Sequence, residues 1–484
     1  MNGSIVAPQA ADYIRILPEI ILTLFGLAIM LVDPLLDEQR GPKILGLLGL
    51  AGALGALAAT VYQAQFPGLG FWNMVQVDAF STFFHFVVIG VTTLTVLTSF
   101  EYLEVQQIRA GEYYGLILFG TVGMCLMSSA VELVLIFIAL EISSISTYVL
   151  AGFRRRAAIS VESSVKYFLL GSFATAFFLY GVALMFGATG STSIFAIKES
   201  LAAGNASLLV YVAIAFMFVG LGFKVAAAPF HVWTPDVYEG APAPITGFMS
   251  TAPKAAAFAV LLRVLFEINA PGRVWLIWVA AALSMTLGNV GALVQNNVKR
   301  LLAYSSIAHA GYLLVAFAAL PGNGIPAAMF YAASYAAMNV GAFAVVSHFA
   351  GAGERCVSLD DYAGLGRRSP LLAATLTIFL LSLIGIPMTG GFFAKFYVFS
   401  AALQANLTGL VTIGVINSAV GAYYYLRIIV MMYMKEPREE TPIAPIPWGL
   451  GAALAASLLA TIYLGVLPGR VLDYASRSAT DLLR

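Results

Sequence analysis

Residues 222–258 read GFKVAAAPFHVWTPDVYEGAPAPITGFMSTAPKAAAF, an apolar passage that contains two lysines and several prolines. Proline removes a backbone donor and clashes with the preceding helical turn, so an apolar helix is expected to break or end just after Lys224, before Pro229. A second helix is expected to continue through Pro253 to Lys254, about midway along it. Broken membrane helices free backbone groups at the depth where transporters bind ions. The passage therefore predicts a membrane protein that handles charge within the bilayer.

Apolar residues dominate the rest of the chain as well. Of 484 residues, 60% are hydrophobic and only 10% are charged. Only helices or closed barrels satisfy the backbone in lipid, and the unbroken apolar runs exclude a barrel. A helical span needs about 20 apolar residues, and fourteen candidates are centred near residues 25, 53, 89, 121, 142, 175, 217, 254, 284, 310, 338, 386, 421 and 457. We expect an all-α polytopic membrane protein with no soluble domain for nucleotide, flavin or peripheral redox chemistry.

The two ends of the chain and its cysteines add little chemistry. The N-terminus lacks a basic region and a clear small-residue cleavage site before its apolar run, so it is interpreted as an uncleaved first helix. Cys125 and Cys356 are too few for a disulfide framework or a cysteine-held metal cluster, and free cysteines are usually packed in the interior. We expect no metal site, and the net charge of +1 carries no information about partners.

The distribution of lysine and arginine predicts an orientation. The segments that follow odd-numbered helices carry thirteen of these cations, whereas the opposite side carries seven. Such an excess marks the cytoplasmic side, so both termini are predicted to face the other compartment. Five cations remain inside apolar stretches. One of them, Arg427, lies within about two turns of its helix end, where its stem can extend to the headgroups.

The other four are Lys166, Lys224, Lys254 and Lys395. An ammonium at the bilayer centre costs roughly 3 kcal/mol on insertion scales, so an ionisable intramembrane residue is a functional hypothesis by default. Desolvation disfavours the charged form of lysine and a nearby carboxylate favours it. Moving one proton or one carboxylate can therefore switch the next lysine.

Glu141 is the acid expected to pair with Lys166. It lies near the middle of the fifth helix, and Lys166 lies just over a turn inside the sixth, after a short arginine-rich turn. At about 1.5 Å per residue, their backbones lie roughly 16 and 7 Å below the cytoplasmic boundary, so we expect a direct or water-bridged pair. A static ion pair that only locates two helices is the alternative. Glu132 and Glu162 are expected at the interfaces, although Glu162 and Lys166, at i and i+4, could share a helix face.

A second break is expected in SLIGIPMTGGFFAKFYVF, residues 382–399. Pro387 and the pair Gly390 and Gly391 interrupt an apolar helix, and Lys395 lies just beyond them. A proline and glycine break in corresponding halves of a membrane protein points to an inverted repeat with its site at the repeat interface. The irregular backbone at both breaks is predicted to face the interior.

Histidines give one further candidate. His309 lies near mid-membrane between the two halves, where histidine can relay protons near neutral pH; a packed, hydrogen-bonded histidine is the alternative. His231, beside the first break, is expected near the cytoplasmic surface, where it shapes or caps a proton entrance. His85 and His348 are expected to be structural.

These residues form a predicted row of titratable groups near the middle of the bilayer, suited to proton transfer: Glu141, Lys166, Lys224, Lys254, His309 and Lys395. Coupled titration drives protons only if an outside source of free energy biases it. The chain has no ligand-binding or redox motif, so the energy must come from a partner.

Three stretches identify a family. The passage 222–258, NNVKRLLAYSSIAHAGYLL at 296–314 and the second break at 382–399 resemble the antiporter-like membrane subunits of respiratory complex I, over nearly the whole chain. The variant VYEGAPAPITGF, the lysine at the second break and the lack of a long C-terminal lateral helix are most similar to the subunit N family of bacterial NADH-quinone oxidoreductase, the counterpart of mitochondrial subunit 2.

The resemblance implies an architecture and a role for each residue. It implies two inverted five-helix repeats with broken helices 7 and 12, the first in 111–268 (helices 4–8) and the second in 269–436 (helices 9–13). Helices 1–3 would occupy 1–110, and helix 14 with a tail would occupy 437–484. Glu141 and Lys166 would form the switching pair and Lys224 would be the channel lysine. Lys254 would connect the two halves centrally, His309 would bridge them, and Lys395 would be the exit-side residue.

The resemblance also implies a setting. The chain would be a proton-translocating, multi-pass subunit of the bacterial inner membrane, coupled to quinone reduction elsewhere in the complex. Quinone, FMN and iron-sulfur clusters would belong to partner subunits. Its partners would be other membrane-arm subunits, the lipid bilayer and protons, with no nucleic acid.

Two alternatives remain open. Subunits of cation/proton antiporters and of membrane-bound hydrogenases share the lysine before PFHxW, although EGAPAP argues against them. A membrane scaffold that conducts nothing, with its charges fixed as ion pairs, belongs to a different class.

Overall fold

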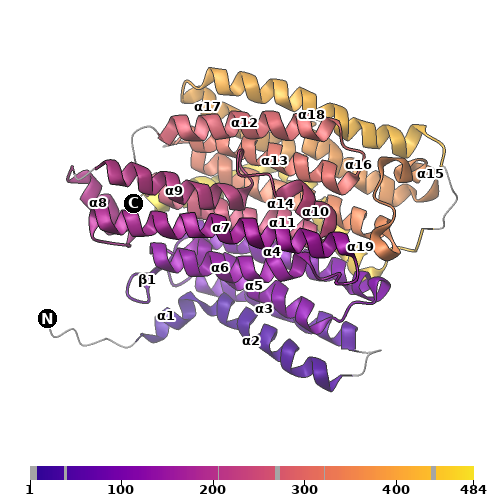
Figure 1. The fold of residues 1–484 in the computed structure, drawn as a ribbon, viewed down its shortest axis with the longest axis horizontal. Helices are drawn as coiled ribbons and strands as arrows, with labels where there is room; N and C mark the ends of the chain where they lie inside the picture. Colours follow the sequence, from indigo (N-terminus) through magenta and orange to yellow (C-terminus); the bar gives the residue numbers. More distant parts are fainter. Residues whose placement is uncertain are drawn as a thin grey trace.

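Long helices lie side by side and run along the longest axis of the molecule (Figure 1). The computed structural model describes residues 8–36, 41–204, 207–267, 273–320, 322–437 and 443–483. Three cations counted in the orientation argument, Arg40, Arg438 and Arg484, lie outside these residues. The all-α, multi-pass fold class is confirmed.

The N-terminal part contains four helices and a small hairpin. Its elements are α1 (Ala10–Arg15), α2 (Leu17–Val32), the 3₁₀ turn η1 (Asp33–Leu35), α3 (Gly41–Gln63), the antiparallel strands β1 (Gly68–Gly70) and β2 (Val75–Val77), and α4 (Ala79–Gln106). The Asp78 carboxylate accepts a hydrogen bond from the Ser81 amide at 2.6 Å. This side-chain cap fixes where α4 begins.

The middle part contains the first predicted break. Its elements are α5 (Gly111–Ser129), α6 (Leu133–Ala151), α7 (Ala158–Thr189), α8 (Ile194–Ala202), α9 (Leu208–Val225), α10 (Thr234–Gly240) and α11 (Ala243–Glu267). Glu132 lies at the end of α6 as expected, where its carboxylate caps the helix by accepting from the Leu135 amide at 2.7 Å.

The C-terminal part contains the second break. Its elements are α12 (Arg273–Leu293), α13 (Val298–Ala318), α14 (Gly324–Ala350), the 3₁₀ turns η2 (Ala352–Glu354) and η3 (Leu359–Tyr362), α15 (Leu365–Arg368), α16 (Pro370–Ile384), α17 (Gly390–Gln404), α18 (Thr408–Met434), α19 (Trp448–Val466) and α20 (Pro468–Leu483). The last of these falls in the segment that the sequence assigned to helix 14 and a tail.

Helices occupy the predicted spans. Thirteen of the fourteen predicted centres fall inside a described helix, and the other, near 386, falls between α16 and α17. Twelve described helices are long and apolar enough to cross a membrane. The total of fourteen spans, the segment boundaries and the inverted repeat stay predictions.

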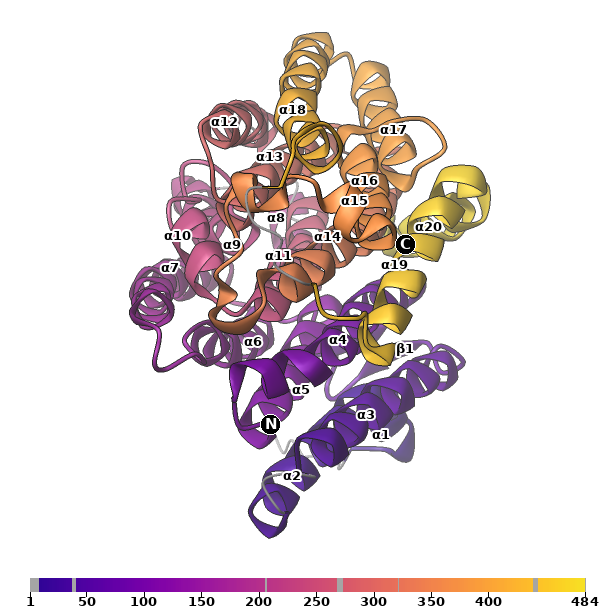
Figure 2. The same ribbon diagram turned by 90° about the vertical axis from the view of Figure 1, so that its right-hand side faces the viewer.

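Three central helices form the core of the molecule. The apolar windows of α11, α13 and α14 are almost wholly buried inside the chain, whereas those of α2 and α18 are mostly exposed. Viewed end-on, α11 and α14 lie near the centre, with α2 and α18 at opposite edges (Figure 2). A charged side chain on α11 or α13 is therefore surrounded by protein.

Both predicted helix breaks are confirmed. Helix α9 ends at Val225, and Ala226 adopts a left-handed conformation with φ 59°. Helix α16 ends at Ile384 before Gly385, whose φ is 93°. Helix α11 continues through Pro253 as expected.

Both breaks are covered at their start and exposed at their proline. At the first break Ala226, Ala227 and Ala228 are fully buried, but Pro229 is exposed and Val232 is 64% exposed, so only the start of this break faces the interior as predicted. At the second break Ile386 and Met388 are 41% and 71% exposed, so the prediction of an interior-facing segment is wrong for this outer loop. The end of α16 points its free carbonyls inward, where they accept hydrogen bonds from Lys395.

Candidate functional site

Three buried lysines share one arrangement. Lys224, Lys254 and Lys395 each donate a hydrogen bond to a serine hydroxyl on a neighbouring helix. Each ammonium also lies within 6 Å of the centre of a tyrosine ring. The ring face attracts a cation, and the hydroxyl can either accept from an ammonium or donate to a neutral amine. The arrangement therefore suits both protonation states of lysine.

Lys224 occupies the last turn of α9, just before the first break, and is 3% exposed. Its Nζ lies 2.8 Å from Ser144 Oγ on α6 and 5.7 Å from the centre of the Tyr167 ring. Glu141 lies one turn before Ser144 on α6, and its charge acts on Lys224. Glu141 Oε1 is buried and has no hydrogen-bond partner among the described residues. The base that faces Glu141 is therefore Lys224.

The expected direct pair between Glu141 and Lys166 is wrong. Lys166 Nζ lies 2.7 Å from Glu162 Oε1 and 2.7 Å from Asp236 Oδ2, and the lysine side chain is 42% exposed. The depth argument placed the two backbones correctly on adjacent helices, but the direction of a side chain around the helix axis depends on its helix position. Lys166 points from α7 toward α10 instead of α6. The alternative that Glu162 and Lys166 share a helix face is confirmed.

Lys254 lies in the central helix α11 and is 3% exposed. Its Nζ donates to Ser306 Oγ of α13 at 2.6 Å and lies 5.7 Å from the centre of the Tyr238 ring. Pro253 cannot donate to the Met249 carbonyl four residues earlier. The Tyr238 hydroxyl donates to that carbonyl at 3.4 Å, so the proline helps to place the ring beside the lysine.

His309 lies one turn after Ser306 on α13 and is 2% exposed. Its Nδ1 lies 2.7 Å from the Tyr331 hydroxyl, and its Nε2 lies 3.2 Å from the Tyr425 hydroxyl. The imidazole is hydrogen-bonded on both sides by groups that can donate or accept. The packed, hydrogen-bonded interpretation is thus confirmed, and it is compatible with proton relay.

Lys254 and His309 line one small cavity together with Ser306, Tyr331 and Tyr335. The cavity leaves about 20 Å³ for the centre of a water-sized sphere. A space of about 10–15 Å³ by this measure holds one water when polar groups surround it. The cavity beside Lys254 and His309 is therefore large enough for a single water.

Lys395 lies on α17 after the second break and is 8% exposed. Its Nζ donates to the Ile384 carbonyl at 2.8 Å, to the Leu383 carbonyl at 3.2 Å and to Ser418 Oγ at 2.8 Å. The last carbonyls of a helix have no partner within it, so the end of α16 supplies acceptors to the lysine. The ammonium lies 4.8 Å from the centre of the Tyr312 ring, and that ring lies 5.7 Å from the imidazole of His309.

Aromatic rings occupy the space between Lys224 and Lys254. The Tyr167 and Trp233 rings stack with centroids 4.4 Å apart and an interplanar angle of 9°. Trp233 in turn meets Tyr238 edge to face at 5.9 Å. The ring beside one lysine is therefore joined to the ring beside the next by a single tryptophan.

A charged cluster connects α7, α10 and α13. Arg300 Nη1 lies 2.6 Å from Asp236 Oδ1 and 2.8 Å from Glu239 Oε2, and Asp236 also binds Lys166. The short helix after the first break is thus held by ion pairs on both sides. Lys166 and Arg300 share the carboxylate of Asp236 in this helix.

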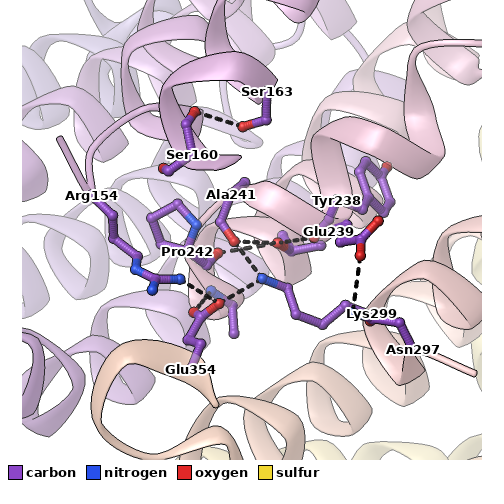
Figure 3. Close-up of polar contacts among 12 residues, drawn as sticks. Arg154, Ser160, Ser163, Tyr238, Glu239, Ala241, Pro242, Asn297, Lys299 and Glu354 are labelled. Carbon is purple, nitrogen blue, oxygen red and sulfur yellow. Dashed lines mark hydrogen bonds and ion pairs between the residues drawn. The ribbon is translucent and has the colours of Figure 1, made fainter. Parts of the chain in front are cut away.

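A second, deeper network surrounds Glu354 (Figure 3). The carboxylate lies 2.7 Å from Lys299 Nζ and 2.9 Å from an Arg154 guanidinium nitrogen, and it accepts from the Tyr102 hydroxyl and the Ala243 amide at 2.7 Å each. Burial alone would raise the pKa of Glu354, but Lys299 and Arg154 hold the pKa below its usual value. The network ties η2 to α4, to the turn after α6, and to the starts of α11 and α13.

The remaining titratable and cationic residues have separate roles. Arg427 donates to Asn296 Oδ1 at 2.8 Å and to the Gln295 carbonyl, so it fixes the turn after α12. His348 Nε2 lies 3.0 Å from the Ala444 carbonyl, as a structural residue would. His231 is half-buried beside the first break. Cys125 is fully buried, which confirms its packing role.

Sequence reasoning missed the neutral partners and two acids. Ser144, Ser306 and Ser418 were not singled out, although Ser306 lies in the quoted stretch one turn before His309. Asp236 and Glu354 were missed because they belong to short segments between the long apolar helices, where an acid is ordinarily solvated. A search for hydroxyl residues one turn from each intramembrane charge would have found two of the three serines.

Comparisons with known proteins show the family of this chain. Residues 130–421 match the family described as NADH:quinone oxidoreductase/Mrp antiporter, transmembrane. NADH-quinone oxidoreductase subunit N 2 of Koribacter versatilis is 67% identical over 492 residues, covering 100% of both chains. Subunit N 1 of Solibacter usitatus is 50% identical, covering 97% of this chain and 98% of that one.

A solved structure shares the fold. A chain of respiratory complex I from Thermus thermophilus with bound aureothin superposes with a TM-score of 0.81 at 38% identity, covering 94% of this chain and 98% of that chain. The family match over residues 130–421 spans both helix breaks and the positions of all six residues of the predicted row.

Proposed function

The chain belongs to the subunit N family of NADH-quinone oxidoreductase, the antiporter-like proton-translocating subunits of the complex I membrane arm, and we propose that its protons move along the buried lysine row. It is a subunit of an enzyme complex. The proposed route begins at Glu141 and Lys224, continues through Lys254 and His309, and ends at Lys395.

The repeated geometry of the three lysines carries this proposal. Each ammonium is nearly buried and is held by a hydroxyl and a ring. Among the described residues, Lys254 and Lys395 have no carboxylate within ion-pair distance. A buried charge without a counter-ion is costly, so the neutral and charged forms of these lysines are closer in free energy than in water. The charge of a neighbouring site is then enough to shift a proton.

The link between the halves rests on His309. A water in the adjoining cavity would connect it to Lys254. On the other side its ring packs against Tyr312, the ring that faces Lys395. Tyrosine hydroxyls on both imidazole nitrogens can pass a proton in either direction.

The role proposed for Lys166 differs from the one that the family resemblance implies, in which it forms a switching pair with Glu141. Its contact with Asp236 couples the exposed face of α7 to α10, the helix after the break at which Lys224 lies. We propose that Lys166 acts by holding or releasing α10, while the charge of Glu141 acts directly on Lys224.

The proposed setting follows from the family and from the cation distribution. Partners would be other membrane-arm subunits in a bacterial inner membrane, with both termini on the periplasmic side. Quinone, FMN and iron-sulfur clusters would be held by partner subunits, and the free energy released there would bias the lysine row.

The test compares Lys224→Ala and Glu141→Ala in the assembled complex. Both variants should assemble, keep electron transfer to quinone and pump fewer protons per electron, because the first exchange of the row is lost. Lys43→Ala is the matched control, since Lys43 is 72% exposed and pairs with Glu104 at the surface. Assembled variants that pump at the wild-type ratio would contradict the route and favour a non-conducting scaffold.

A further inference from the structure

Glu19, near the start of α2, is a buried carboxylate outside the lysine row. It is 4% exposed, and neither carboxylate oxygen has a hydrogen-bond partner among the described residues. The imidazole of His85 on α4 is fully buried, with its Nε2 3.6 Å from Glu19 Oε1. An unpaired carboxylate in such a place would cost several kcal/mol, so the histidine is its natural counterpart.

Both ring nitrogens of His85 face oxygen acceptors. Nε2 lies 3.0 Å from the Cys125 carbonyl, and Nδ1 lies 3.2 Å from Gln63 Oε1. The Gln63 amide nitrogen donates to the Arg15 carbonyl, which fixes its oxygen toward the histidine. A neutral imidazole carries one N–H and an imidazolium carries two. The surroundings of His85 therefore fit the protonated ring.

The nearby charges are already paired with one another. Arg263, at the end of α11, lies 3.1 Å from Asp78, and Arg15 lies 3.0 Å from Asp12. The Cys125 thiol on α5 is fully buried. Among the described residues, these pairs leave Glu19 and His85 as the two ionisable groups that must neutralise each other.

We propose that Glu19 and His85 form a proton-binding site in the N-terminal helices, separate from the lysine row. An ionised Glu19 carboxylate and a neutral His85 imidazole together bind one further proton. The pair is then neutral overall, whether that proton lies on the ring or on the carboxyl group. Loss of the proton at high pH leaves a buried negative charge between the side chains of α2, α4 and α5. The inference does not rest on proton flow through Lys224, Lys254 or Lys395.

The experiment uses the assembled complex with Glu19→Gln, His85→Gln and the double variant. The temperature at which heat releases subunit N is measured between about pH 6 and pH 9, the range around histidine titration. The double variant, which buries two neutral groups, should lose less than the sum of the two single variants. As the pH rises, the release temperature of the wild type should fall toward or below that of the double variant. Of these two proteins, only the wild type has a proton to lose at this site.

Thr92→Val is the matched control. Thr92 and Thr121 form a buried, neutral hydrogen bond of 2.8 Å between the same helices α4 and α5, so its effect should not change with pH. Additive losses for Glu19 and His85, or a difference from the double variant that is constant with pH, would overturn the proposal. Failure of the double variant to assemble while Thr92→Val assembles would also overturn it.

Measurement of the metal content distinguishes a bound proton from a bound metal ion at this site. Ligand atoms of Glu19, His85 and Cys125 all lie within 4.8 Å of one another. A stoichiometric metal that is lost in Cys125→Ser and kept in Cys356→Ser would replace the proton and overturn the assignment. Equal metal content in the wild type and both cysteine variants supports it.

Discussion

Lys254 on α11 and His309 on α13 face the same small cavity, although the sequence offered no contact between them. The lysine side of the cavity belongs to the first predicted repeat and the histidine side to the second. Ser306, one turn from His309, binds the lysine directly. The cavity between these two helices is therefore large enough for one water.

Filling this cavity should slow proton transfer without disturbing the lysines themselves. Ala332 lines the cavity and is 4% exposed, so Ala332→Val would occupy the space of the water. We expect fewer protons pumped per electron in the assembled complex and a loss of stability of about 1–3 kcal/mol from overpacking.

Ala336→Val, one turn further along α14, is the control for overpacking alone. Ala336 is also 4% exposed but does not line the cavity. If both variants pump equally well at equal stability, the cavity does not carry the proton.

The positions of the spans and of both breaks could be predicted from the sequence. Apolar length predicts where a helix crosses, and the missing amides at Pro229 and Pro387 predict where it stops. The exposure of the loop at each break could not be predicted, because Val232, Ile386 and Met388 are apolar whether they face protein or lipid. Burial of an apolar residue in a membrane protein carries little sequence signal.

The members of the candidate site were predictable, but their pairing was not. Rarity of charge singled out Lys224, Lys254 and Lys395, since each is costly in an apolar helix. Depth along the helices suggested that Lys166 pairs with Glu141. The rotation of α7 about its axis instead directs Lys166 toward Asp236. Such rotation is set by packing over the whole helix, as at Gly181, where an added Cβ would press on α9 at the Met217 backbone amide.

Glycine at position 391 should be required for the second break. A Cβ there would collide with the carbonyl oxygen of Ser382 on α16, the helix end that supplies acceptors to Lys395. Gly391→Ala should therefore displace this end, destabilise the subunit by about 1–3 kcal/mol and lower proton pumping. Heat release of the subunit and the pumping ratio are the two measurements.

Gly409→Ala is the matched control for the change itself. A Cβ at Gly409, in the first turn of α18, meets no atom within 4 Å. This variant should be neutral or more stable, because alanine is favoured over glycine in a helix by roughly 0.5–1 kcal/mol. Equal effects of the two substitutions would remove the steric reason for the glycine at 391.

Glu354 should stabilise the subunit through its charge, with a defined dependence on pH. Its pKa is held below the usual value of 4.5 by Lys299 and Arg154 against the effect of burial. A carboxyl group with a lowered pKa in the folded state contributes stability above its unfolded pKa, and this contribution is lost as the pH falls through the folded value. The contribution of Glu354 should thus be complete near neutral pH and decline only below about pH 4.5.

Glu354→Gln tests this directly, since it keeps the shape and removes the charge. Lys299 and Arg154 are then left without their shared counter-ion, which costs about 3–5 kcal/mol when one partner of a buried ion pair is removed. Heat release of the subunit near neutral pH should show this loss, and the gap to the wild type should narrow as the pH falls below 4.5. Glu112→Gln is the control, because Glu112 pairs with Arg155 on the surface with 59% of its side chain exposed, where an ion pair contributes roughly 0–1 kcal/mol. A gap for Glu354→Gln as small as that for Glu112→Gln would mean that the hydrogen bonds from Tyr102 and the Ala243 amide, rather than the charge, hold this junction of helices together.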